Sequence, residues 1–349
     1  EPGDKIKKKR YNAFRQFFLL TQRNTAVKLA DKLSLTLILL QAIVIAGLLV
    51  ITFYGSRLDY SDSDQFAKTW YYFSSEKDRK NEIREPVIIQ RLLKESKAWA
   101  RKEVRLVGEQ TAQRKTSILF LLIASSIWFG IINGSREIIS EKVVLQRETK
   151  TYLCLSSYLM SKLFILSLIA VLQTLLLLGA VCWFLISFHL FFMYWAILFF
   201  TAVASSCLSL FISSWVKTEQ AALMAVPIII IPQLLLGGLI RPIKFLSDHI
   251  SGGFHLSDII LQKWALKAML MCDAWKAKDV LSQVVNLNNS EELDYLKFVK
   301  ISTFELVFGA HQGFLTGINL SSYYPIIMIF MHGLIPLIFT YALLKIKYS

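Results

Sequence analysis

The chain has 349 residues, of which 54% are hydrophobic and only 18% are charged, and its mean hydropathy is +0.48. These values exclude an ordinary soluble fold. Lys and Arg outnumber Asp and Glu by 39 to 25, and in so apolar a chain this excess indicates cytoplasmic loops and anionic headgroups, not nucleic acid. Because several uncharged stretches reach the length that crosses a bilayer, about 20 residues of helix, we expect an all-α, multi-pass protein of a plasma or inner membrane.

Residues 1–32 form the predicted cytoplasmic lead, which is rich in Lys and Arg. From Tyr11 onward, apolar side chains such as Phe14, Phe17 and Phe18 are interleaved with basic ones, as in an amphipathic helix that lies in the membrane interface. A soluble helix packed on a partner domain is the alternative. The basic residues before the first span place the N-terminus on the cytoplasmic side.

Six apolar stretches within 33–349 predict a six-span membrane domain with both termini cytoplasmic. The segment 54–116 then becomes an external helical insertion, since long loops cross largely regardless of their charge. The segment 241–323 is external as well. The predicted spans are 33–53, 117–133, 158–188, 191–215, 221–240 and 324–344.

The motifs of ATP binding and of common hydrolases are missing from this sequence. It has no G-x-x-x-x-G-K-[ST] loop, no G-x-S-x-G and no H-E-x-x-H. Its four Cys and five His show no metal-binding spacing. We therefore expect no catalytic residue, metal site or cofactor in this chain.

The predicted spans are almost free of ionisable residues, whereas ion-coupled transporters carry such residues along their pathway. The energy for transport must then come from another domain, and an apolar interior suits a lipophilic cargo. The small hydroxyl residues of the span 191–215, such as Ser205 and Ser209, indicate close helix packing.

The segment 134–152 places a compact group of charges between two spans. Read as a helix over 135–149, it has an apolar side of Ile138, Ile139, Val143 and Leu145 and charges at three- and four-residue spacings. An interfacial connector whose charges face water is the alternative. The candidate coupling residues are Arg136, Glu137, Glu141, Arg147 and Glu148.

The stretch WFGIINGSREIISEKVVLQRETKTYLCLSSYLMSKL, which begins at Trp128, resembles the link between the second and third spans of type-2 ABC exporters of the G (White) subfamily. It looks closest to bacterial members whose ATPase half carries forkhead-associated domains. Three further stretches are similar to that subfamily: QFFLLTQRNTAVKLADKLSL, ASSCLSLFISSWVKTEQAALMAVPIIIIPQLLLGGLI and ILQKWALKAML. The segment 54–116 departs from it.

The resemblance implies that 134–152 is the coupling helix, which fits a groove of the ATPase domain. It also implies two membrane halves that form a homodimer around a central cavity, with ATP and Mg bound by ATPase domains that are fused upstream or separate. Cargo contacts in that subfamily come from the second and fifth spans. The matching positions are Ser125, Ser126, Phe129, Ile132, Pro227, Ile231, Leu234, Leu235 and Leu236.

Two functions remain open at this point. One is an ATP-driven exporter of a lipophilic, lipid or lipid-linked compound. The alternative is a non-transporting mechanotransducer of the same class, whose external segments, 54–116 above all, regulate an envelope protein. A membrane scaffold that moves nothing is a third and weaker interpretation.

Overall fold

The computed structural model describes residues 12–54, 115–151, 153–186, 188–237, 256–284 and 323–348, and the regular elements in these ranges are helical. The all-α prediction is confirmed for this part of the chain. Nearly all of the predicted external insertion 54–116, and most of 241–323, lie outside the described residues.

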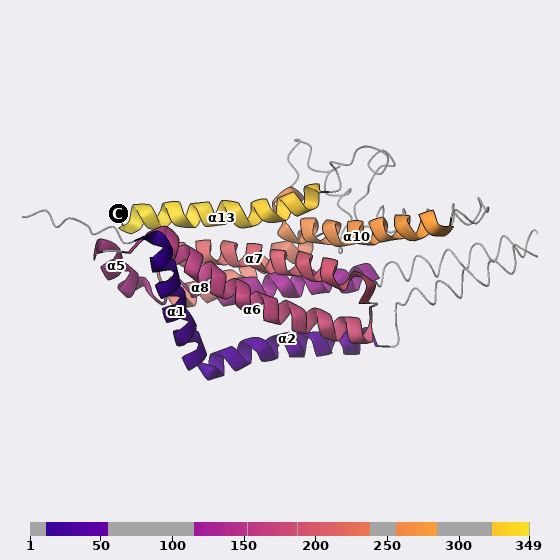
Figure 1. The fold of residues 1–349 in the computed structure, drawn as a ribbon, viewed down its shortest axis with the longest axis horizontal. Helices are drawn as coiled ribbons and strands as arrows, with labels where there is room; N and C mark the ends of the chain where they lie inside the picture. Colours follow the sequence, from indigo (N-terminus) through magenta and orange to yellow (C-terminus); the bar gives the residue numbers. More distant parts are fainter. Residues whose placement is uncertain are drawn as a thin grey trace, which may run out of the picture.

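Six of the described helices are long and apolar enough to cross a membrane, as the sequence predicts. They run side by side along the long axis of the molecule (Figure 1). Their bounds agree with the predicted spans to within a few residues, and the largest shifts are at the ends of the third, fifth and sixth. The spans are α2 (Lys32–Thr52), the helix Lys115–Gly134, here called the second span, α6 (Leu155–Phe184), α7 (Phe191–Trp215), α8 (Glu219–Leu236) and α13 (Tyr324–Tyr348).

The helix α1 (Ala13–Ala30) crosses one end of this bundle at a steep angle to the spans (Figure 1). It packs on α6 through one buried stripe, Gln16, Leu20 and Asn24, and leaves Phe14 and Phe18 exposed. The chain turns into α2 at once, where the Asp31 side chain caps the helix by accepting from the Ser34 amide at 3.1 Å. An exposed aromatic face beside the first span is what an interfacial helix requires.

The second span and α7 approach each other unusually closely because both present small residues. A Cβ atom on Gly130 would lie 2.3 Å from the Ala202 carbonyl oxygen and 2.0 Å from Ser205 Oγ. The Ser209 hydroxyl of α7 donates to the Ile131 carbonyl at 2.6 Å. This contact confirms the prediction that the small residues of α7 serve helix packing.

At the other end of the bundle, a 3-10 turn, η3 (Leu256–Ile259), leads into α10 (Leu261–Val284), which packs on α7, α8 and α13. The side-chain amide of Gln262 donates to the Phe120 carbonyl at 2.8 Å, and its backbone N–H donates to Gln233 Oε1 at 3.0 Å. α10 thus connects the second span to α8. Its residues from 261 to 270 are all buried.

Candidate functional site: a buried ion-pair network under the charged segment

The charged segment lies at the α1 end of the bundle, but only its second half is helical. Residues 135–141 form turns, and the helix α5 spans Lys142–Thr151, so the single helix predicted over 135–149 is wrong for its first half. The turn is stabilised by α7, because Ser213 Oγ accepts hydrogen bonds from the amides of Ile138 and Ile139 at 3.1 and 3.2 Å. A side chain from another helix therefore satisfies backbone groups that a helix would satisfy internally.

The predicted apolar side of the segment is divided by this turn. Ile138 and Ile139 are buried beside α7, and Leu145 is buried too. Val143, however, is 78% exposed and points away from the bundle side of the segment. It belongs to the outer face of α5, which corrects its assignment to the buried side.

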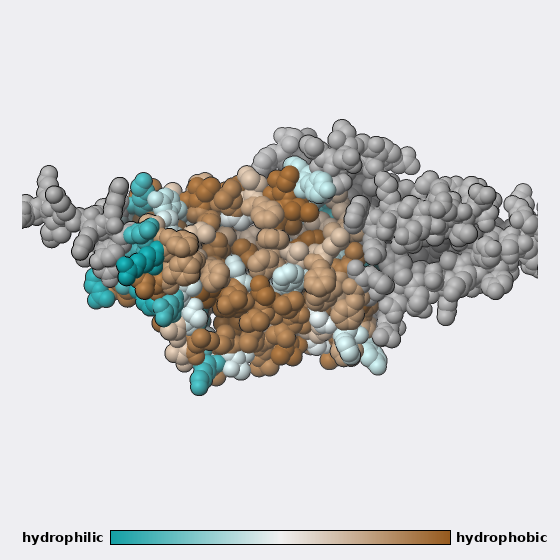
Figure 2. Space-filling view, in the orientation of Figure 1, coloured by the Kyte–Doolittle hydropathy of each residue, from teal (hydrophilic) through white to brown (hydrophobic). Residues whose placement is uncertain are grey.

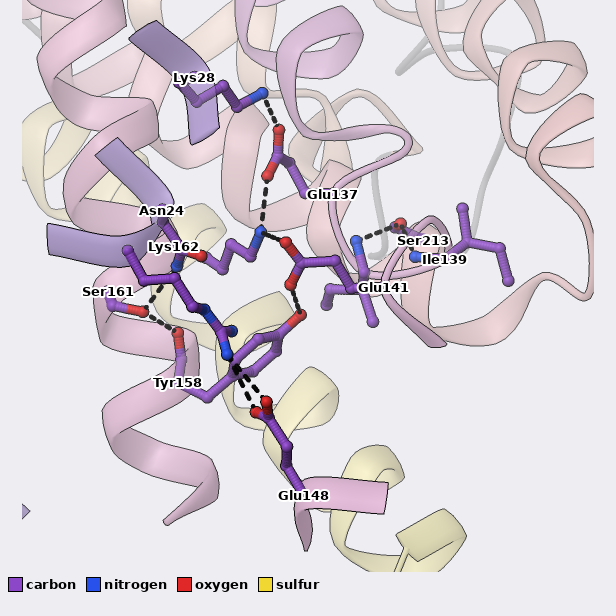
Figure 3. Close-up of polar contacts among 12 residues, drawn as sticks. Asn24, Lys28, Glu137, Ile139, Glu141, Glu148, Tyr158, Ser161, Lys162 and Ser213 are labelled. Carbon is purple, nitrogen blue, oxygen red and sulfur yellow. Dashed lines mark hydrogen bonds and ion pairs between the residues drawn. The ribbon is translucent and has the colours of Figure 1, made fainter. Parts of the chain in front are cut away.

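Two carboxylates of the turn point into the protein and share one lysine of α6 (Figure 3). Lys162 Nζ lies 3.2 Å from Glu137 Oε2 and 2.7 Å from Glu141 Oε1. The other oxygen of Glu137 pairs with Lys28 of α1. The other oxygen of Glu141 accepts from the Tyr158 hydroxyl at 3.2 Å.

Burial makes these contacts strong. Lys162 is 4% exposed and Glu137 is 8% exposed. Burial alone would raise the pKa of the Glu137 carboxyl, but the positive charges of Lys162 and Lys28 and their hydrogen bonds outweigh it, so that its pKa lies below the usual value. The two lysines balance the two carboxylates, and breaking such a buried pair costs about 3–5 kcal/mol.

A second tier of contacts connects α1 to α5 and α6. Arg23 Nη1 contacts both carboxylate oxygens of Glu148, at 2.9 and 3.2 Å. Asn24 Nδ2 donates to Ser161 Oγ at 3.3 Å. Because the Arg23 side chain is 38% exposed, its pair with Glu148 contributes little stability, about 0–1 kcal/mol. Its main effect is to fix how α5 lies against α1.

The network therefore joins the charged segment to two elements that enter the membrane. α1 continues directly into α2, and Lys162 lies in the second turn of α6. A displacement of the turn 135–141 must either move α1 and α6 with it or break buried ion pairs. The arrangement can transmit force from the turn to these two elements.

The five predicted coupling residues fall into two groups. Glu137, Glu141 and Glu148 face inward and hold the segment in place, whereas Arg136 and Arg147 are exposed. The inward partner Lys28 was not singled out by sequence reasoning. A signal that could have found its counterpart on α6, Lys162, is that ionisable residues in a charge-poor span are usually paired.

The predicted pathway residues of the second span are mostly engaged in packing. Ser126 Oγ donates to the Leu198 carbonyl at 2.6 Å, and Phe129 is fully buried. Ser125 Oγ donates to the Leu121 carbonyl of its own helix, and Ile132 is partly buried.

The predicted pathway residues of α8 are arranged differently. Pro227, Ile231 and Leu235 are exposed on one side of the helix, while Leu234 and Leu236 are partly buried. Gln262 of α10 connects the second span at Phe120 to α8 at Gln233, and the exposed side of α8 is left uncovered by the described residues of this one chain.

The sequence was compared with known proteins. The family described as ABC-2 type transporter matches residues 15–272, which is well over half of the chain. A search of curated proteins finds no match.

Proposed function

The chain belongs to the ABC-2 type transporter family, and we propose that it is the membrane half of an ATP-driven exporter of a lipophilic, lipid or lipid-linked compound. It is a membrane subunit of an ABC transporter, and membrane domains of this family work with ATPase partners, typically as dimers. The G (White) subfamily assignment, the homodimer and the export direction are parts of the proposal.

The buried network of Lys28, Glu137, Glu141 and Lys162 is the observation that carries the coupling part of this proposal. The turn 135–141 lies at the end of the bundle, where an ATPase domain could reach it (Figure 1). Four charged groups tie this turn to α1 and α6. In the proposed mechanism, ATP-driven movement of the ATPase domain pushes on the charged segment, and the network passes the movement to the first and third spans.

The character of the spans supports a lipophilic cargo. Charged residues are few within the six membrane-spanning helices, and α8 turns an apolar face outward that includes Met224 and Ile228, each 71% exposed. A cargo that follows such a face needs no ion pathway, and its movement has to be driven from the charged end of the bundle.

Substitution of Lys162 tests the coupling role. Lys162→Met keeps the length and apolar stem of the side chain but removes the charge that Glu137 and Glu141 share. We expect ATP hydrolysis by the assembled transporter to become independent of the membrane half. Transport of a fluorescent lipid analogue in proteoliposomes should fall by tenfold or more, since the broken buried pair is worth more than 1.4 kcal/mol.

The companion variants distinguish loss of coupling from loss of folding. Glu219→Gln removes an exposed carboxylate from the same end of the bundle and should leave both activities unchanged. Lys162→Met leaves Glu137 and Glu141 without their shared lysine and can therefore destabilise the fold. The variant Lys162→Met/Glu141→Gln/Glu137→Gln leaves no unpaired buried carboxylate, so we expect its stability to recover while transport stays low. Transport at the normal rate in a correctly assembled Lys162→Met transporter would contradict the proposal.

A further inference from the structure

A cavity of about 160 Å³ lies in the angle between α1 and α2 and is also lined by α6 and the turn 135–141; we call it the elbow cavity. Figure 2 shows hydrophilic residues gathered at the end of the molecule where α5 lies, and a mainly hydrophobic surface along the spans. The elbow between α1 and α2 lies at the border of these two surfaces (Figure 1). Since α1 has the exposed aromatic face of an interfacial helix and α2 is a span, this border is the level at which lipid headgroups meet acyl chains.

The walls of the elbow cavity change from polar to apolar in the direction of the spans. On α2, Ser34 precedes Leu35 and Ile38, and on α6, Lys162 precedes Ile165. The three apolar residues lie within the first three turns of their helices. A cavity of this kind suits an amphiphile, which places a charged group at the polar end and hydrocarbon at the other.

The elbow cavity contains a carboxylate that the buried network does not neutralise. The two carboxylates of the turn 135–141 are paired with the two lysines of that network. Asp31, by contrast, accepts a hydrogen bond from the Ser34 amide through Oδ1, and no cation contacts it in the part of the chain that the structure describes. An exposed carboxylate at the rim of a polar cavity attracts a positively charged group.

Two hydroxyl groups add to the acceptors of the elbow cavity. Ser34 lines it from α2 and Ser140 from the turn 135–141. Within the described ranges neither hydroxyl group takes part in a hydrogen bond, and Oδ2 of Asp31 has no partner either. A primary ammonium has three N–H donors, which these three oxygens can accept. The described lining includes no aromatic side chain, whereas sites for a quaternary ammonium use aromatic cages.

Lys28 supplies a positive charge to the same cavity. Its side chain is 31% exposed and pairs with Glu137, so its ammonium has N–H donors left for a phosphate oxygen. Lys28 lies three residues before Asp31 at the end of α1, and residues at this spacing are neighbours, about 5–6 Å apart at Cβ. A cation and an anion at this separation are complementary to an ethanolamine headgroup, in which two methylene groups separate the phosphate from the ammonium.

We propose that the elbow cavity binds a membrane phospholipid whose headgroup ends in a primary ammonium, of the phosphatidylethanolamine kind. Asp31, Ser34 and Ser140 accept from the ammonium, Lys28 contacts the phosphate, and the acyl chains follow the apolar wall of α2. The bound lipid connects the elbow to the turn 135–141. It is a resident ligand and not the cargo, so this site is independent of the proposed export.

A series of headgroups tests the site in the complete transporter, purified in detergent. Dioleoyl phosphatidylethanolamine, its N-methyl and N,N-dimethyl forms and phosphatidylcholine differ only in how many N–H donors methyl groups have replaced. Native mass spectrometry measures the retention of each added lipid. We expect the apparent affinity to fall with each methylation, by about tenfold across the series, because charge-assisted hydrogen bonds are lost. Equal retention of the four lipids would overturn the inference.

Asp31→Asn tests the carboxylate without removing the helix cap, since asparagine caps as well as aspartate does. The variant should bind phosphatidylethanolamine about threefold more weakly than wild type, a modest loss because Asp31 is exposed, and should discriminate less against phosphatidylcholine. Glu219→Gln makes the same carboxylate-to-amide change at the start of α8 and should bind like wild type. A full preference for phosphatidylethanolamine in Asp31→Asn would contradict the role of this carboxylate.

Two competitors identify which part of the lipid is recognised. Phosphatidylglycerol has the phosphate but no amine, and it should bind as weakly as phosphatidylcholine. If it binds as well as phosphatidylethanolamine, the cavity recognises phosphate alone and the inference is wrong. Glycerophosphoethanolamine has the headgroup but no acyl chains, and in excess it should leave the bound lipid in place. Its displacement of the lipid would show that the cavity takes a soluble amine, which would also overturn the inference.

Discussion

At the scale of single residues, Glu137 is the best example of a charge whose role follows from its surroundings. Burial favours the neutral acid, but the two lysines that contact it, Lys28 and Lys162, keep it ionised. Each lysine comes from a different helix, so the ionised carboxylate is also a junction between α1 and α6. The role of this charge is therefore to fix the position of the turn.

The lowered pKa of Glu137 predicts how stability depends on pH. Because the pKa is lower in the folded protein than in the unfolded chain, the carboxylate contributes stability that is fully present above its unfolded pKa. This contribution is lost as the pH falls through the folded pKa. In thermal unfolding of detergent-solubilised protein, Glu137→Gln should therefore be less stable than wild type at pH 7, and the two should approach each other as the pH falls below the ordinary glutamate pKa of about 4.3.

The exposed Glu219→Gln variant is the control for this experiment and should track wild type across the range. A Glu137→Gln deficit that stays constant down to pH 3 would show that the ion pairs with Lys28 and Lys162 do not determine the stability of the turn.

At the scale of elements, the second span and α7 pack closely because small residues of both helices meet. Gly130 faces Ala202 and Ser205, and hydroxyl groups of both helices donate to carbonyls of the other. Without a hydrophobic driving force between helices in lipid, such close approach and hydrogen bonding hold the helices together. The hydroxyl of Ser213 extends the same contact into the turn 135–141.

This packing predicts that one methyl group is harmful at Gly130. Gly130→Ala would place its Cβ 2.3 Å from the Ala202 carbonyl, so the helices must separate, at a cost of about 1–3 kcal/mol. The apparent Tm of the detergent-solubilised protein should fall accordingly.

Gly47 of α2 provides the matched control, because a Cβ atom there would have no neighbour within 4 Å. Gly47→Ala should be neutral or slightly stabilising, by up to about 1 kcal/mol, since alanine is the better helix former. If both variants unfold at the wild-type temperature, the close approach at Gly130 is not a determinant of stability.

At the scale of the whole molecule, the predicted pathway is incomplete in one chain. Pro227, Ile231 and Leu235 lie on an uncovered side of α8, and a pathway needs a wall facing them. Since membrane domains of this family typically act as dimers, we expect the α8 face of a second copy to supply that wall.

Disulfide crosslinking can test this arrangement. In a background in which Cys154, Cys182, Cys207 and Cys272 are replaced by Ala, Ile228→Cys should crosslink two copies under mild oxidation. Phe339→Cys on α13, which is 57% exposed, should not, because we expect that helix to face lipid. Crosslinks at Phe339 and none at Ile228 would place the dimer interface on the wrong side for this pathway.

The sequence by itself determined the order and approximate bounds of the six spans that the structure describes, because crossing a bilayer requires about 20 apolar residues of helix. It also drew attention to the charged segment, since charge between two spans is conspicuous. The cytoplasmic placement of both termini and the coupling role remain predictions from sequence and resemblance.

Only the tertiary structure decided which of those charges face inward. Helical periodicity describes one isolated helix, and it cannot register that Ser213 of α7 supplies the hydrogen bonds that turn 135–141 away from a helix. Nor can it show that Lys28, 109 residues before Glu137, lies against that residue. The burial of an ion pair depends on contacts between distant parts of the chain, and these contacts make the inner side of the segment acidic and leave its outer side basic.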